Sequence, residues 1–161
     1  MFQRIRGSRG FTVAELITVV AIIGILASVA LPVARFSIRR QKEIELRDRL
    51  RKITDAVDRY HDLNTMQQGP IRPAQMQALG SDGYPKDLDE LLKGIELSDG
   101  RKVRLLRERD LIDPMTGRKE WITLSTTDDP DTSMSNKDNV FEVHSTSTAL
   151  SLDGKTRYNE W

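Results

Sequence analysis

Residues 10–34 read GFTVAELITVVAIIGILASVALPVA and are the most informative part of this chain. From Leu16 to Ala34 no residue is charged, which gives 19 consecutive uncharged and mostly apolar positions. As a helix with a rise of about 1.5 Å per residue, this stretch spans about 28 Å, close to the hydrocarbon thickness of a bilayer. Its apolar side chains cover every face of such a helix, so the pattern favours a membrane-spanning helix over a core helix packed on one side.

The residues ahead of the apolar stretch are basic. Residues 1–10 contain no acidic side chain and three basic ones, Arg4, Arg6 and Arg9. This is typical of the positive n-region of an exported protein. A conventional signal peptide would be cleaved after Ala30, but Glu15 would then lie in or beside an apolar region longer than about 15 residues. The pattern therefore argues against removal of the whole apolar stretch.

The sequence from Gly10 to Glu15 resembles the N-terminus of type IV pilins and type II secretion pseudopilins. That family has a short basic leader ending in Gly, then Phe, then Glu at the fifth position of the mature chain. The resemblance implies that prepilin peptidase cuts between Gly10 and Phe11 and methylates the new N-terminus on Phe11. It also implies an α+β, pilin-like fold, with a long N-terminal transmembrane helix packed by a small antiparallel β-sheet head.

Glu15 is the charged residue that immediately precedes the apolar stretch. A carboxylate in a membrane helix costs about 2.5 to 3.5 kcal/mol, so it needs a cation or a function. Cleavage would place an α-ammonium on Phe11, four residues away on the same helical face. The resemblance adds a second option, in which Glu15 pairs with the Phe11 ammonium of a neighbouring subunit during assembly. A third option is that Glu15 only caps the helix N-terminus.

An amphipathic helix is expected to follow the apolar stretch. Residues 33–68 contain neither Gly nor Pro, and apolar side chains recur there at helical spacing: Leu46, Leu50, Ile53, Val57 and Tyr60. This stripe predicts a surface on which the C-terminal half packs, with a coiled-coil seam as the alternative. The chain thus divides into a leader (1–10), a transmembrane and assembly helix (11–34), an amphipathic periplasmic stem (35–65) and an α+β head (66–161).

The first part of the head has clear punctuation. Residues 66–84 are rich in Gly and Pro and predict a connection without regular structure. Pro85 fits the first turn of a short helix that ends at Gly94. Ile95 to Leu97 and Val103 to Leu105 predict two short extended pieces.

The last third predicts a β-hairpin. Trp121 to Leu124 and Val140 to Val143 are rich in β-forming residues and are separated by a polar loop. A single hairpin is marginal alone, so we expect it to pack on the stem. Three motifs of the head are similar to those of the major, or G-type, pseudopilins: Tyr84-Pro85-x-x-Leu88, Ile112-Asp113-Pro114-x-x-Gly117 and Leu152-Asp153-Gly154.

Composition excludes several kinds of chemistry. The chain has no cysteine and two histidines, His61 and His144, which lie in no metal-binding or catalytic pattern. Nothing pairs a nucleophile with a base, so we expect a non-enzyme. The formal charge of +1 gives no reason to expect nucleic acid as a partner.

One loop offers hard-oxygen ligands. Its acidic residues are Asp128, Asp129, Asp131 and Asp138, accompanied by Ser133, Ser135 and Asn136. The resemblance implies a calcium site after the Asp-Gly element, but only seven residues follow Gly154, so that loop is shortened. A solvated acidic loop and a calcium site therefore both stay open, and we assign no cofactor and no metal ligand.

The resemblance implies a structural subunit that polymerises into a pseudopilus for type II protein secretion. Its partners would be further copies of itself, other pseudopilins, prepilin peptidase, the inner-membrane secretion platform and membrane lipid. The chain would cross the bacterial inner membrane once, with its head and the filament in the periplasm. A type IV pilin for motility, adhesion or DNA uptake is the nearest alternative, and a membrane-tethered binding module that never polymerises is the alternative of another class.

Overall fold

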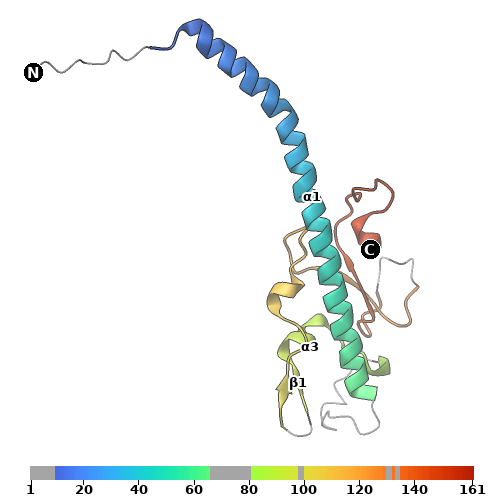
Figure 1. Cartoon of the computed structure of the whole chain (residues 1–161). Helices are drawn as coiled ribbons and strands as arrows, with labels where there is room; N and C mark the ends of the chain where they lie inside the picture. Colours follow the sequence, from blue (N-terminus) through green and yellow to red (C-terminus); the bar gives the residue numbers. More distant parts are fainter. Residues whose placement is uncertain (1–9, 66–80, 98–99, 130–131, 133–134) are drawn as a thin grey trace, which may run out of the picture. The chain divides into compact units, whose positions relative to one another are not determined.

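The protein is described from a computed structural model that covers residues 10–65, 81–97, 100–129, 132 and 135–161. The chain divides into two compact units, residues 1–39 and residues 40–161. One long N-terminal apolar helix and two small antiparallel sheets give an α+β fold with a pilin-like layout (Figure 1). The predicted fold class is confirmed. The predicted leader lies outside the described residues except for Gly10, and so does most of the connection predicted for residues 66–84.

Helix α1 (Val13–Thr65) contains both the apolar stretch and the stem. Thr12 begins it, since its hydroxyl oxygen accepts a 3.2 Å hydrogen bond from the Glu15 amide and its carbonyl accepts one of 3.1 Å from Leu16. This is the geometry of an N-cap. The helix continues through Pro32 and runs for 53 residues.

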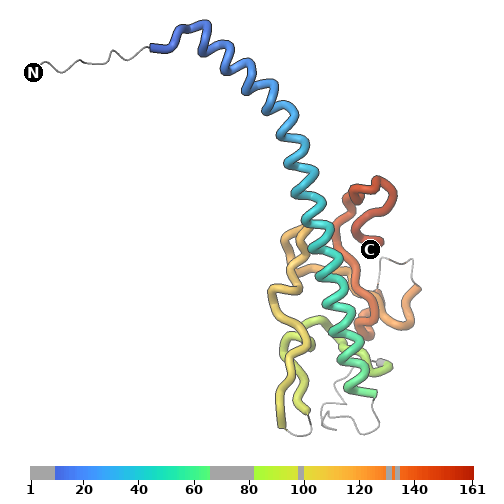
Figure 2. The backbone as a smooth tube through the Cα atoms, in the orientation of Figure 1, coloured from blue at the N-terminus to red at the C-terminus, as the bar shows by residue number. Residues whose placement is uncertain are grey.

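The apolar stripe of the stem is the centre of the core in the second unit. Leu46, Ile53 and Val57 are fully buried, Tyr60 is 4% exposed, and Leu50 is half-buried. Figure 2 traces the backbone of the second unit beside the stem. The stripe packs against apolar side chains of that unit: Leu91, Ile95, Leu106, Leu111, Val140 and Val143. The prediction that the C-terminal half packs on the stripe is confirmed.

Helix α3 (Leu88–Lys93) begins three residues later than predicted. Asp87, not Pro85, starts it, because the Asp87 carboxylate accepts a 3.0 Å hydrogen bond from the amide of Glu90. Gly94 ends the helix as expected, with a φ of 81°. A Cβ at Gly94 would lie 2.8 Å from the carbonyl oxygen of Val103, so both the backbone angle and the close approach require glycine.

The first sheet joins β1 (Ile95–Glu96) to β2 (Lys102–Val103) in antiparallel register. Strand β1 begins where the sequence predicts an extended piece and is one residue shorter, whereas β2 begins one residue before the predicted piece and ends two residues sooner. The amides of Leu105 and Leu106 instead donate to the carbonyl of Leu91 at 3.2 Å, which ties this segment to α3.

The second sheet is the predicted hairpin of β3 (Trp121–Leu124) and β4 (Glu142–Ser145). Strand β4 begins two residues later than expected: the amide of Val140 donates to the carbonyl of Pro85, and only from Phe141, whose amide donates to the carbonyl of Leu124, does the chain reach β3. It also extends further, to Ser145, whose hydroxyl donates a 2.7 Å hydrogen bond to the buried carboxylate of Asp113. Asp113 further accepts from the amide of Met115, so the Asp113-Pro114-x-x-Gly117 motif is a turn that anchors this sheet.

Candidate functional site

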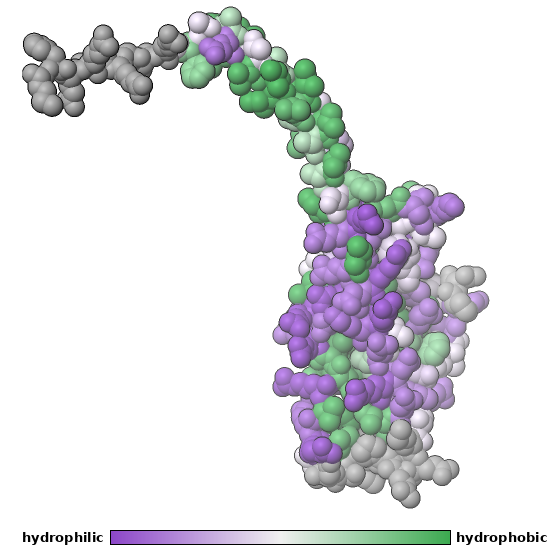
Figure 3. Space-filling view, viewed as in Figure 1, coloured by the Kyte–Doolittle hydropathy of each residue, from purple (hydrophilic) through white to green (hydrophobic). Residues whose placement is uncertain are grey.

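The N-terminal part of α1 presents apolar side chains on all sides. Between Val13 and Ile38 the large apolar residues are 46% to 74% exposed, and no part of the most apolar window is buried. Figure 3 shows apolar side chains crowded along this segment and polar ones over most of the visible face of the second unit. The segment is long and apolar enough to cross a membrane by length and composition.

The polar side chains inside the apolar segment bond to the helix itself. The hydroxyl of Thr18 donates to the carbonyl of Ala14 at 2.9 Å, and that of Ser28 donates to the carbonyl of Ile25 at 2.7 Å. These hydroxyl groups therefore need no water, which suits a helix surrounded by hydrocarbon.

Glu15 is the exception. Its carboxylate lies in the first turn of α1 and is exposed. Across the described residues, no hydrogen bond or ion pair engages that carboxylate, although the Glu15 amide is bound by Thr12. The positive end of the helix dipole favours an anion at this position, but it supplies only part of what a carboxylate loses on leaving water. Glu15 thus stands at the head of an apolar helix with room for a cation.

The two residues predicted to flank the cleavage site precede the helix. Gly10 and Phe11 are both outside α1, and the Phe11 side chain is 74% exposed. A Cβ built on Gly10 meets no atom within 4 Å, and the backbone there does not adopt a left-handed φ. The fold therefore accepts a larger residue at position 10, and a requirement for glycine there would come from outside the folded chain.

Glu43 was missed by the sequence analysis. It lies three residues before Leu46 on the apolar stripe and is only 9% exposed. Its Oε1 atom accepts hydrogen bonds from the Tyr158 hydroxyl at 2.8 Å and the Leu152 amide at 2.6 Å. The signal in the sequence was its position, since a carboxylate that continues an apolar stripe must find a partner when the stripe is buried.

The two histidines and Asp153 make contacts within the fold. His61 stacks on Tyr84 with ring centroids 4.3 Å apart, and His144 Nδ1 lies 2.6 Å from the carbonyl oxygen of Trp161. The hydroxyl of Ser151 donates a hydrogen bond to the Asp153 carboxylate, and this bond is the main reason why the pKa of Asp153 is lowered to about 2. The turn after this residue is therefore held by an ionised carboxylate.

The acidic loop around Asp128 is partly described. The Asp128 carboxylate accepts hydrogen bonds from the amides of Ser125 at 2.8 Å and Asn136 at 3.2 Å, and such bonds lower its pKa. Within the described segments no group of three or more acidic or histidine side chains is placed to hold a metal ion. Asp131 and Ser133 lie outside those segments, so calcium binding by this loop stays a prediction.

Comparisons with known proteins add no relative. No family model matches the chain, and neither a curated protein nor a solved structure matches it.

Proposed function

We propose that this chain is a prepilin-like structural subunit that is processed between Gly10 and Phe11 and polymerises into a periplasmic pseudopilus for type II secretion. One observation carries the proposal. An apolar helix segment, exposed on every face, begins at Glu15, whose carboxylate has no partner among the described residues, and an unobstructed glycine, Gly10, lies five residues before it. A lipid environment accounts for the apolar surface, and an assembly partner accounts for the carboxylate.

The subunit spans the bacterial inner membrane once, through the segment that begins at Phe11, and keeps its C-terminal unit in the periplasm. The exposed apolar surface of α1 supports insertion. Orientation rests on the resemblance of residues 10–15 to prepilins, because basic residues follow the apolar stretch as well as precede it: Arg35, Arg39, Arg40 and Lys42. Anionic lipid headgroups suit these side chains.

Glu15 directs assembly in this proposal. After cleavage the nitrogen of Phe11 becomes an ammonium group, and Glu15 of one subunit pairs with that ammonium of the next. In this pair each charge compensates the other within the apolar phase, and the pairing fixes the register between neighbours. Copies of this chain are the main partners, with other pseudopilins, prepilin peptidase and the secretion platform as the machinery around them.

Intact-mass analysis of protein purified from membranes tests the processing step. The expected mass lacks residues 1–10 and carries one additional methyl group on Phe11. Replacement of Gly10 by Leu should leave full-length precursor in the membrane, and the open space around Gly10 means that the fold survives this change. A wild-type chain that retains Met1, or that begins at Leu31, contradicts the proposal.

Deletion of the gene distinguishes the machines. Loss of secreted proteins with normal twitching and transformation supports the pseudopilus. Loss of twitching or DNA uptake with normal secretion assigns the subunit to a type IV pilus. A chain that is processed, forms no polymer and is needed for neither secretion nor twitching is a membrane-tethered module, which contradicts assembly as its role.

A further inference from the structure

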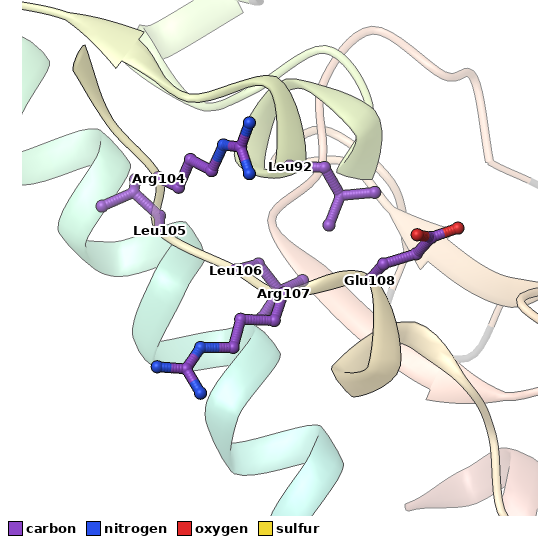
Figure 4. A pocket seen from close by; sticks show the side chains of 6 residues that line it. All are labelled: Leu92, Arg104, Leu105, Leu106, Arg107 and Glu108. Atoms are coloured by element: carbon purple, nitrogen blue, oxygen red, sulfur yellow. The ribbon is translucent and has the colours of Figure 1, made fainter.

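A hollow of about 790 Å³ lies beside the segment that follows β2 (Figure 4). We call it the arginine hollow, and its lining residues are Leu92, Arg104, Leu105, Leu106, Arg107 and Glu108. Leu106 is 5% exposed, and Leu92 and Leu105 are half-buried, so the hollow has an apolar part that the chain leaves open. Figure 4 shows Arg104 and Arg107 extending from the same segment in different directions.

The arginine hollow carries uncompensated positive charge. In the described part of the chain, neither Arg104 nor Arg107 takes part in an ion pair or a side-chain hydrogen bond, and both are exposed. Glu108, the acidic residue of the lining, is already paired with Lys119. The hollow thus offers two free guanidinium groups next to leucine side chains, which suits a partner with carboxylates beside an apolar or aromatic side chain.

A second surface of the same unit has the opposite character. We call it the acidic aromatic patch, and its residues are Asp58, His61, Asp62, Asp82, Tyr84 and Phe141. The Tyr84 ring stacks on His61 and lies edge-on to the Phe141 ring, with the centroids of these two rings 5.3 Å apart. Phe141 is 45% exposed.

Carboxylates surround these rings. The carboxylates of Asp58 and Asp62 are exposed and make no hydrogen bond or ion pair within the described residues. Asp82 accepts a 3.0 Å hydrogen bond from the neutral hydroxyl of Thr126 and keeps its charge uncompensated. Burial and then these three carboxylates raise the pKa of Tyr84, which indicates that their negative field reaches the ring. The patch therefore presents aromatic side chains framed by negative charge.

The two surfaces lie on opposite faces of α1. Arg49 pairs with Asp110 of η2 (Glu108–Leu111), the element that begins at the arginine hollow. Asp58 of the patch follows Arg49 by nine residues, which is about two and a half helical turns and so about half a revolution around the axis. One chain therefore cannot bring its own patch into its own hollow.

We propose that the acidic aromatic patch of one copy of this chain docks into the arginine hollow of the next. Arg104 and Arg107 would pair with Asp58 and Asp62 of the neighbour, and Phe141 would cover the half-buried leucines, where a guanidinium over an aromatic ring adds attraction. Such a contact is heterologous, so each pair of copies leaves one hollow and one patch free at its ends, and the contact repeats along a filament. The inference rests on the proposed function, because it takes the copies to polymerise in a common membrane.

Introduced cysteines test the contact in the full chain, which has no cysteine of its own. Thr65 is exposed and lies on the same helical face as Asp62, and Glu108 is exposed beside the arginine hollow. A chain carrying both Thr65→Cys and Glu108→Cys should form a ladder of disulfide-linked multimers in membranes. Either substitution alone should give none, and a mixture of the two single variants should stop at dimers.

These outcomes separate the contact from the proposed function. Sedimentable polymer without a ladder overturns the docking of patch into hollow and leaves the proposed function intact. Absence of both the ladder and any polymer overturns both. Covalent dimers formed by one single variant would show a symmetric contact, which also overturns the inference.

Charge reversal tests the chemistry of the contact on the same cross-linking background. Arg104→Glu with Arg107→Glu, or Asp58→Lys with Asp62→Lys, should each lower the multimer yield about tenfold or more, because several opposed charges become like charges. Coexpression of the two variants should restore the yield, since reversed and native surfaces then pair between alternating copies. Lys155→Glu reverses one exposed charge in the turn after Asp153, away from both surfaces, and should leave the yield unchanged. Failure of coexpression to restore multimers overturns the pairing.

Discussion

The Tyr158 hydroxyl donates a 2.8 Å hydrogen bond to Glu43 across 115 residues of sequence, and both side chains are buried. The same Glu43 oxygen accepts the amide of Leu152 at 2.6 Å. One carboxylate on α1 therefore holds the C-terminal segment at two points. Because buried donors cost free energy when they lose their acceptor, this relationship makes Glu43 structural as well as charged.

Tyr158→Phe is expected to lower the free energy of unfolding of the second unit by about 1.5 to 3 kcal/mol, the range for a hydrogen bond to a charged group. Glu43→Leu should cost more, because it leaves both the Tyr158 hydroxyl and the Leu152 amide without an acceptor. Glu43→Gln keeps an acceptor oxygen and is the matched control, with the smallest loss. Urea unfolding of the full chain in detergent, followed by tryptophan fluorescence, measures all three, and equal stability of the Leu and Gln variants would contradict this role.

Two isoleucines of α1 separate core from surface. Ile53 is fully buried against the C-terminal half, so Ile53→Ala should lower the free energy of unfolding by about 2 to 5 kcal/mol through lost burial and a cavity. Ile44 is 60% exposed, and Ile44→Ala should change it by no more than about 0.5 kcal/mol. The same urea titration compares them. Similar losses at both positions would show that the stripe does not form the core.

The stability of the turn from Ser151 to Thr156 should depend on pH under acidic conditions. The hydroxyl of Ser151, followed by the amide of Lys155, lowers the pKa of Asp153 from 3.8 to about 2. A lowered pKa in the folded state means that the carboxylate stabilises this turn above about pH 4 and that this contribution is lost as the pH falls towards 2. The Lys155 amide resonance should therefore shift over this range in a pH titration followed by NMR. Asp153→Asn removes the ionisable group, and persistence of the shift in that variant would assign it to another residue.

Glu15 is expected to serve assembly and not insertion. Replacement by Leu removes a charge that costs about 2.5 to 3.5 kcal/mol in a membrane helix, so the monomer should insert at least as well. Polymer yield should fall, because the Phe11 ammonium of a neighbour loses its partner, while leader cleavage and monomer level persist. Glu15→Asp keeps the charge with a shorter reach and should give an intermediate yield. Cross-linking of overproduced subunits in membranes measures this, and normal polymer formation by the Leu variant excludes the pairing.

Local chemistry was readable from the sequence. The uncharged stretch from Leu16 to Ala34 required an apolar helix with no buried face, and the spacing from Leu46 to Tyr60 gave the face of the stem that is buried. Both signals depend on residues within one or two helical turns of each other, and the helix itself fixes the directions of their side chains. The hairpin of β3 and β4 and the extended pieces of β1 and β2 were predicted from β-forming residues and turn signals, with strand ends that were wrong by one or two residues; the pairing of β1 with β2 was not predicted.

Which distant groups meet depends on how the chain packs. Nothing in the local pattern around Glu43 names Tyr158 as its donor, and Arg49 finds Asp110 across 61 residues. The same holds for the arginine hollow and the acidic aromatic patch, whose residues come from separate segments. Periodicity reports that a side chain faces inward, whereas its partner depends on the path of the whole chain. Local patterns were therefore enough to predict the helix, its apolar segment and its buried stripe, whereas the partners and the charged surfaces follow from the packing of the second unit.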